Sequence, residues 1–209
     1  NEGQAIAGVL TTLQKYDYKV IVVNDGSIDK TASEVAKFPE VILLNHVVNR
    51  GMGAGLQTGN EYALQDGAEI IVHFDADGQM QAKDIAAMIE PIVEGRADIV
   101  MGSRHMGKKS NLPWMKRYLI QPPAKLVDFI FTGLSLTDVH NGFRALSREA
   151  AAKIVIRQDG MAHATEILQQ VNKLNLKYQE VPVEIIYHDF GQNILGGFKI
   201  IRDLIIKRN

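Results

Sequence analysis

The chain has 209 residues, of which 46% are hydrophobic and 22% are charged, with a net charge of −1 and no cysteine. These values are typical of one globular domain, exclude disulfides and thiolate metal sites, and give no electrostatic reason to expect a nucleic-acid partner. No run of about 18 apolar residues is present, so the sequence predicts no transmembrane helix. The absence of cysteine fits a reducing compartment, and we expect a protein of the cytoplasm.

The first half of the chain alternates short apolar, β-branched runs with segments of helical periodicity. The helical segments are 4–15, 29–38, 51–67 and 82–94. The expected strands are 19–27, 41–46, 69–77 and 98–104. This alternation is typical of βαβ units and predicts an α/β fold, Rossmann-like, with a mostly parallel sheet and helices on both faces.

The second half alternates less regularly. We expect a basic loop after residue 104, and then the following elements: a helix at about 115–132, a loop or short strand and a helix within 136–154, a helix at 163–175 and a strand at 177–187. Residues 188–209 form an amphipathic stretch with basic residues, which is either an ordinary terminal helix or a helix that lies on a membrane surface.

The amino-terminal end lacks the strand that should precede a helix in a βαβ unit. The chain begins Asn1-Glu2-Gly3, without methionine, and the helical pattern starts near Gln4. We therefore expect that the chain is cut in front of its first strand.

Four charged side chains lie at or just after the ends of expected strands. They are Asp25, Asp75, Asp77 and Arg104. In open α/β sheets, ligands bind at the carboxyl ends of the strands. The sequence therefore predicts that these residues share one site.

The stretch Asp75-Ala76-Asp77-Gly78-Gln79 places two carboxylates and an amide just after a buried strand. Mg²⁺ and Mn²⁺ prefer oxygen ligands, and Mg²⁺ keeps coordination positions for phosphate oxygens. The alternative is a solvated loop whose aspartate caps the next helix. The sequence alone leaves both open, although the other charged residues at this edge favour the metal.

Two further segments have a binding and a structural interpretation. Asp25, in the sequence VVNDGS, could accept hydrogen bonds from a nucleotide, or it could cap the following helix. The glycine-rich sequence NRGMGAG, which contains Gly53, resembles a phosphate-binding loop but lacks the Gly-Lys-Ser/Thr ending. A tight turn that packs closely against its surroundings explains Gly53 equally well.

Three arginines are candidates for binding phosphate, because a guanidinium fork matches phosphate oxygens bidentately. They are Arg104, Arg117 and Arg144, each of which could instead be an ordinary surface residue. Four histidines lie near these segments: His73, His140, His163 and His188. We expect them to be hydrogen-bonded polar residues in preference to ligands.

Taken together, the sequences VVNDGSIDKT, NRGMGAGLQTG, DADGQ, GSR and NGFRALSR stand in an order that resembles the family 2 glycosyltransferases with the GT-A fold. The similarity covers residues 1–187 and is greater to the dolichyl- and polyprenyl-phosphate sugar synthases, because DADGQ resembles their form of the DXD motif. We expect 1–187 to be the catalytic domain and 188–209 to be a separate amphipathic helix.

The resemblance implies roles for individual residues. It implies metal ligands at Asp75, Asp77 and Gln79, which would hold Mg²⁺ or Mn²⁺. It implies contacts with the donor nucleotide-sugar from Glu2, Asp25, Gly53, Asp75, Arg104 and Arg144. It also implies that Asp77, Arg104 and Arg117 act in catalysis, the two arginines by gripping phosphate near the acceptor.

The implied reaction is the inverting transfer of one sugar from a UDP- or GDP-sugar to polyprenyl or dolichyl phosphate, at the cytoplasmic face of a membrane. The sequence contains no acidic pair after NGFR and no Gln-X-X-Arg-Trp, and both absences favour a single transfer to a phosphate. Three alternatives remain open: transfer to a saccharide hydroxyl in cell-surface polysaccharide synthesis, a nucleotidyltransferase, and a sugar-nucleotide binding module without catalysis.

Overall fold

The computed structural model describes residues 1–106, 129–130 and 132–186. Its elements follow the predicted order closely. The helices are α1 (Ile6–Leu13), α2 (Thr31–Val35), α3 (Met52–Gln65), a 3₁₀ turn η1 (Ala82–Asp84), α4 (Ile85–Val93), α6 (Arg148–Lys153) and α7 (His163–Lys173). The strands are β1 (Ile21–Asn24), β2 (Ile42–Asn45), β3 (Ile70–His73), β4 (Ile99–Ser103), β5 (Arg144–Ser147) and β6 (Tyr178–Pro182). Arg117, His188 and the amphipathic stretch 188–209 lie outside the described residues.

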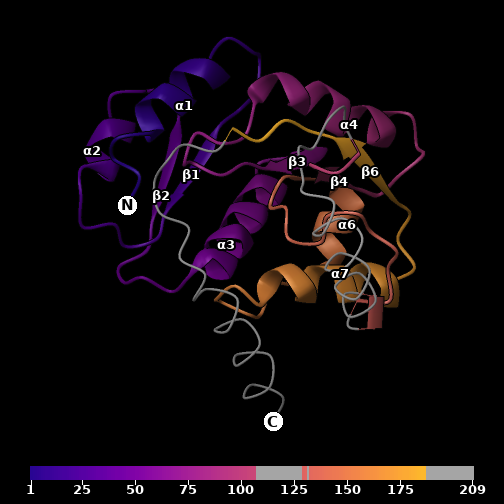
Figure 1. Cartoon of the computed structure of the whole chain (residues 1–209). Helices are drawn as coiled ribbons and strands as arrows, with labels where there is room; N and C mark the ends of the chain where they lie inside the picture. The colour runs from indigo at the N-terminus through magenta and orange to yellow at the C-terminus, as the bar shows by residue number, and fades with distance from the viewer. Residues whose placement is uncertain (107–128, 131, 187–209) are drawn as a thin grey trace, which may run out of the picture.

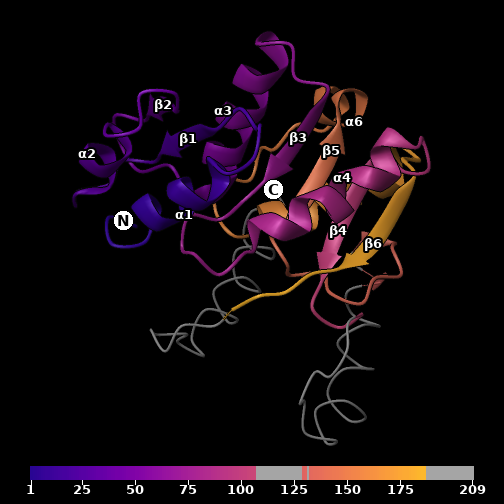
Figure 2. The same cartoon turned by 90° about the horizontal axis from the view of Figure 1, so that it is seen from above.

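The strands form two sheets. β1 and β2 pair in parallel, and the larger sheet has the order β3-β5-β4-β6. Figure 2 shows the four strands of the larger sheet side by side, with β1 and β2 apart from them. In the larger sheet β3, β4 and β6 run in one direction, and β5 is antiparallel to both of its neighbours. The predicted, mostly parallel α/β fold is thus present.

The position of β5 was not predicted. The sequence indicated only a loop or short strand within 136–154, whereas the structure inserts β5 between β3 and β4 in the reverse direction. Residues 104–143 separate β4 from β5, and local sequence patterns do not define the direction in which a chain re-enters a sheet after so long a connection. This insertion brings the NGFR segment next to the strand that ends at the two aspartates.

Helices cover both faces of the larger sheet, as Figure 1 shows. One hydrophobic cluster joins α3, α6 and α7 to one face, through residues such as Ala63, Ala150 and Leu168. A second cluster joins α1 and α4 to the other face, through Leu13 and Met88. Because both faces are covered, the strands can be apolar along their whole length, and polar residues are left to gather where the strands end. In the described part of the chain, no helix is both long enough and apolar enough to cross a bilayer.

Candidate active site

The two aspartates lie on the turn that follows β3. Gly78 has φ of +78°, which reverses the chain after Asp77 at a conformation that side chains with a Cβ rarely adopt. The Gln79 amide donates to Asp77 Oδ1 at 2.9 Å, and the Asp75 amide lies 3.2 Å from Met80 Sδ. The turn therefore holds both carboxylates at the carboxyl end of the strand. The role of the Gln79 side-chain amide as a metal ligand stays a prediction.

Asp75 is the most perturbed carboxyl group of the site. Burial, together with the nearby charges of Asp77 and Glu2, raises its pKa from 3.8 to about 6, although Arg144 opposes the shift. The charges of Glu2 and Asp77 are thus close enough to Asp75 to affect its ionisation, and the roles expected of these three residues stay predictions. A raised pKa with a like-charged neighbour, at a strand end, is typical of functional sites.

The two carboxylates suit a divalent cation whose remaining ligands come from the substrate and from water. Among the described residues, no three acidic or histidine side chains group closely enough to hold a metal ion by themselves. Mg²⁺ is usually bound through one or two carboxylates plus substrate phosphates and water, and Asp75 and Asp77 supply that number. Metal binding by these two residues remains a prediction that the chemistry of the donor set favours.

The NGFR segment packs directly against Asp75. The β3–β5 register pairs His73 with Arg144, and continuing it two residues places Gly142 opposite Asp75. A Cβ on Gly142 would lie 3.1 Å from Asp75 Oδ2, so glycine leaves the space that the carboxylate occupies. Phe143 points to the other face and is fully buried against Phe74.

Arg144 lies beneath the carboxylates and not on an open surface. Its side chain is 1% exposed, and no hydrogen-bond partner of its three guanidinium nitrogens is found among the described residues. Burial lowers its pKa to about 10, while Asp75 and Asp138 favour its charged form. The guanidinium therefore compensates the charge of Asp75 from behind, and its predicted contact with the donor has to be made from a buried position.

Arg104 lies at the same edge of the sheet, but Asp138 holds it. The Arg104 backbone amide and Nε donate to Asp138 Oδ2 at 3.0 and 2.7 Å, and Nη2 donates to Oδ1 at 2.6 Å. Burial would raise the pKa of Asp138, but these hydrogen bonds outweigh it and lower the pKa. Any phosphate that Arg104 grips would share the guanidinium with Asp138, so its predicted role in catalysis is untested.

Sequence reasoning missed Asp138, because its partner Arg104 lies 34 residues earlier in the chain. The residue stands six positions before Arg144, in the sequence LTDVHNGFR, which begins the segment expected to be a loop or a short strand. Its backbone amide donates to Glu180 Oε1 at 3.2 Å, and Thr137 donates to the same carboxylate from its amide and its hydroxyl. Glu180 on β6 therefore fixes the loop that presents Asp138 to Arg104.

Asp25 is occupied by protein groups. It accepts hydrogen bonds from the amides of Arg50 and Gly51 at 2.9 and 2.6 Å, and it contacts His46 Nδ1 at 2.7 Å. Burial opposes ionisation, but these partners outweigh it and lower the pKa of Asp25. Asp25 thus ties the end of β1 to the loop that enters α3, and contact with a nucleotide base would be an additional role. His46, which follows β2 and also meets Thr58 Oγ1 at 2.9 Å, was not among the predicted residues.

The glycine-rich entry to α3 is closed by the chain and not open to phosphate. The Gly53 amide donates to the Asp159 carbonyl at 2.8 Å, and a Cβ on Gly53 would collide with the Gln158 carbonyl oxygen. Close packing, the second interpretation of this segment, therefore accounts for Gly53, and its binding role has no support from the geometry.

Two buried histidines line the interior behind the site. His73 Nε2 meets Asn60 Oδ1 at 2.8 Å, and burial, with Arg144 and His163 nearby, lowers its pKa to about 3. His163 Nδ1 meets the Gly160 carbonyl at 2.8 Å, and burial lowers its pKa as well. Both rings are therefore neutral near pH 7, but His73 Nδ1 is buried and has no hydrogen-bond partner among the described residues.

Comparison with known proteins agrees with this geometry. The model of the family described as Glycosyl transferase family 2 matches residues 1–155. The chain belongs to this family. It is 38% identical to an uncharacterized protein of Methanocaldococcus jannaschii, a match covering 100% of this chain and 88% of that protein. It is 32% identical to the UDP-N-acetylglucosamine--dolichyl-phosphate N-acetylglucosaminyltransferase of Methanococcus voltae, covering 99% of this chain and 92% of that enzyme.

Solved structures confirm the fold. Glucosyl-3-phosphoglycerate synthase from Mycobacterium tuberculosis, in complex with Mn²⁺, UDP-glucose and phosphoglyceric acid, superposes with a TM-score of 0.72 at 17% identity. That match covers 98% of this chain and 74% of the synthase. The family 2 glycosyltransferase therefore has the GT-A fold, as predicted.

The buried Asp75 predicts how stability changes with pH. Its folded-state pKa lies above the unfolded value, so the folded protein loses stability as the pH rises from 3.8 to about 6. With metal chelated, we expect Asp75→Asn to be more stable than wild type at pH 7 by up to about 3 kcal/mol, and this gain should vanish below pH 4. Urea unfolding at both pH values measures the difference.

The control is Asp17→Asn, because Asp17 is exposed to solvent and its carboxylate should contribute little at either pH. An Asp75→Asn variant that is no more stable than wild type at pH 7 would contradict the electrostatic description of Asp75.

The glycines of α3 predict opposite effects of one substitution. We expect Gly53→Ala to destabilise the fold by roughly 1–3 kcal/mol, because the added methyl group meets the Gln158 carbonyl. Gly55→Ala should be neutral or stabilising, since the nearest atom to its Cβ is Val23 Cγ1 at 3.9 Å and alanine favours helix. Thermal unfolding of both variants measures the contrast, and equal shifts would refute the packing explanation.

Proposed function

We propose that this glycosyltransferase moves a single sugar from a UDP- or GDP-sugar to a polyprenyl or dolichyl phosphate, with inversion and with a divalent metal ion. One observation carries the proposal: Asp75 and Asp77 are held together at the end of β3, with the charge of Arg144 behind them. The named activity of the M. voltae relative supports a lipid-phosphate acceptor.

The donor end of the reaction needs charge compensation. When bound to Asp75 and Asp77, Mg²⁺ or Mn²⁺ would supply Lewis-acid stabilisation for the departing nucleoside diphosphate. The protein keeps these ligands in place through the Gln79 amide on Asp77 and through the space that Gly142 leaves beside Asp75. Arg144 adds fixed positive charge beneath the carboxylates without taking up a solvent-facing position.

The acceptor end needs no strong base. A phosphate oxygen attacks the anomeric carbon from the face opposite the leaving group, and the bond from that carbon to the diphosphate oxygen breaks with its electrons. Because the acceptor is already an anion, no proton has to be removed, in contrast to a hydroxyl acceptor. Cations must instead bring two anions together, and we propose that Asp138 orients Arg104 for this purpose.

The metal role of Asp77 predicts a loss of activity. We expect Asp77→Ala to reduce transfer at least about 100-fold and to weaken Mn²⁺ binding, because the leaving group loses its electrostatic stabilisation. The assay combines the protein, Mn²⁺, a panel of UDP- and GDP-sugars and polyprenyl phosphate, with glycolipid as the product. Asp17→Ala, an exposed carboxylate away from the site, is the control, and full activity of Asp77→Ala would disprove the metal assignment.

A site without a general base should accept a phosphate and reject a hydroxyl group. With the preferred donor, we expect transfer to polyprenyl phosphate and none above background to the neutral polyprenol of equal chain length or to free saccharides. Mass spectrometry of the products distinguishes the three. An extended saccharide in place of a lipid-linked sugar would instead establish the alternative of polysaccharide synthesis.

A further inference from the structure

The glycine-rich entry to α3 packs against a segment from the second half of the chain. That segment, residues 155–160, lies between α6 and α7. The Gly53 amide donates to the Asp159 carbonyl at 2.8 Å, and a Cβ on Gly51 would collide with the same carbonyl. Gly51 also has φ of +115°, a conformation that side chains with a Cβ rarely adopt. Both glycines therefore allow the 155–160 segment to lie against the start of α3.

The opposite side of the same loop holds Asp25. The amides of Arg50 and Gly51 donate to the Asp25 carboxylate at 2.9 and 2.6 Å. The Asn49 side chain donates to the Asp25 carbonyl at 2.9 Å. Gly51 is thus in contact with both sides, because its amide binds Asp25 and its Cα lies against Asp159. The position of the loop is therefore set jointly by Asp25 and by the 155–160 segment.

One carboxylate holds the 155–160 segment in this position. Glu166 lies in the first turn of α7, and its Oε2 accepts hydrogen bonds from the amides of Arg157 and Gln158, each at 2.9 Å. Hydrogen bonds to a carboxylate are stronger than those to a neutral acceptor. The carbonyl of Gln158 occupies the space that a Cβ on Gly53 would need. Glu166 therefore acts directly on the part of the segment that contacts α3.

Two glutamines hold the beginning of the segment. Gln170 of α7 accepts from the Val155 amide at 2.9 Å and donates to the Val155 carbonyl at 2.8 Å. Gln57 of α3 accepts from the Ile156 amide at 2.8 Å. In a segment without helix or strand structure, such side chains supply the partners that the backbone needs. The 155–160 segment is therefore a fixed connection between α7 and the start of α3.

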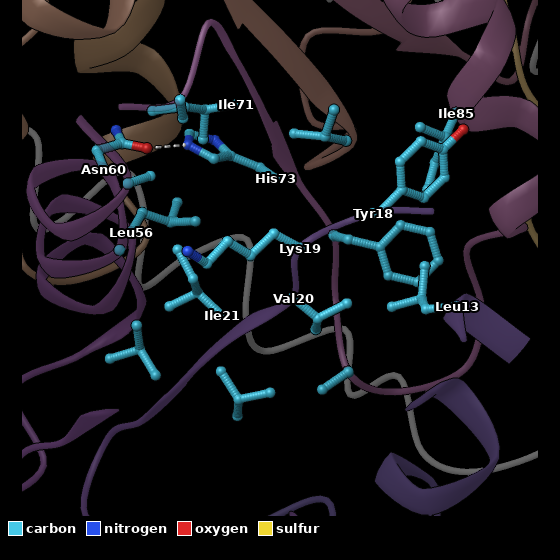
Figure 3. Close-up of a pocket in the computed structure, with 18 of the residues that line it drawn as sticks. Leu13, Tyr18, Lys19, Val20, Ile21, Leu56, Asn60, Ile71, His73 and Ile85 are labelled. Atoms are coloured by element: carbon cyan, nitrogen blue, oxygen red, sulfur yellow. Dashed lines mark hydrogen bonds between the residues drawn. The ribbon is translucent and has the colours of Figure 1, made fainter. Parts of the chain in front are cut away.

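The middle of α3 is fixed separately. Asn60 Oδ1 meets His73 Nε2 of β3 at 2.8 Å, and Figure 3 shows this contact on the wall of a pocket that Leu56 of α3 also lines. This attachment to β3 does not involve Glu166. A change at Glu166 should therefore affect the start of α3 and the loop before it, while the rest of the helix stays in place.

We propose that Glu166 is a positioning residue for the donor end of the site. Glu166 holds the 155–160 segment against the start of α3, and this contact fixes the two amides that bind Asp25. The inference rests on the proposed function in one respect, since it takes Asp25 and its loop as part of the donor site. Glu166 itself does not have to touch the donor.

The first measurement follows individual amides by NMR-detected hydrogen exchange. In Glu166→Ala, exchange should speed up at least about tenfold at Gly51 and Gly53, neither of which is a hydrogen-bond partner of Glu166. The amide of Leu146, in the middle of the larger sheet, should exchange as in wild type, which separates a local effect from global unfolding. Glu166→Gln keeps an acceptor oxygen and loses only the charge, so it should fold and change in the same direction by less. Glu149→Ala, which removes an exposed carboxylate from α6, is the control.

The second measurement is the affinity for the donor. Calorimetric titration with UDP and with GDP, in the presence of Mn²⁺, identifies the nucleotide that wild type binds more tightly. We expect Glu166→Ala to bind that nucleotide at least about fivefold more weakly, with Glu166→Gln in between. In transfer assays the KM for the nucleotide-sugar should rise, whereas the KM for polyprenyl phosphate should stay unchanged. A general loss of structure would not divide the two substrates in this way.

Unchanged exchange at Gly51 and Gly53 in both Glu166 variants would overturn the inference. Faster exchange with unchanged nucleotide affinity would overturn it as well, because the loop would then move without consequence for the donor. If wild type binds neither nucleotide, the proposed function fails and the inference fails with it. If wild type binds a nucleotide and Glu166→Ala binds it equally well, only the role of Glu166 is refuted.

Discussion

The register between β3 and β5 is the constraint on which the site depends. It places Gly142 opposite Asp75 and Arg144 opposite His73, one layer deeper. A slip of one residue would turn Arg144 to the opposite face of the sheet and bring the bulk of Phe143 toward the carboxylate. Each residue of Gly-Phe-Arg in the sequence NGFR therefore has a separate role beside the aspartate. Gly142 leaves space for the carboxylate, Phe143 packs on the far face of the sheet, and Arg144 supplies positive charge.

This arrangement combines two groups that are unfavourable alone. A buried carboxylate beside a second carboxylate is costly to ionise, and a buried guanidinium without hydrogen-bond partners among the described residues is costly to desolvate. Each is partly stabilised by the charge of the other. The site is thus suited to bind a charged substrate complex. Its buried charges lower the stability of the fold.

Much of this could be predicted from sequence, because local patterns report local structure. Periodicity located every described helix, and apolar runs ended by Asp75 and Arg104 located β3 and β4. Long-range pairing was beyond such patterns. Nothing local indicates that β5 enters the sheet between β3 and β4, that Asp138 holds Arg104 across 34 residues, or that His46 and the loop at Arg50 occupy Asp25.

The same limit explains why some candidate binding residues have structural contacts in the folded protein. Asp25 and Gly53 have the residue types that nucleotide binding requires, yet each is engaged by chain that lies more than 20 residues away. A carboxylate with three donors already in place is a rigid acceptor, so Asp25 fixes the wall of the site whether or not it also meets the base.

The candidate site is built from two parts of the fold. Glu2, Asp25 and the loop before α3 belong to the part built on β1, whereas Asp75, Asp77 and Arg104 belong to the larger sheet. A donor that contacts both parts needs their relative position fixed within a fraction of an ångström. The loop before α3 contributes to this rigidity, because its amides bind Asp25 on one side and the Gly53 amide donates to the Asp159 carbonyl on the other.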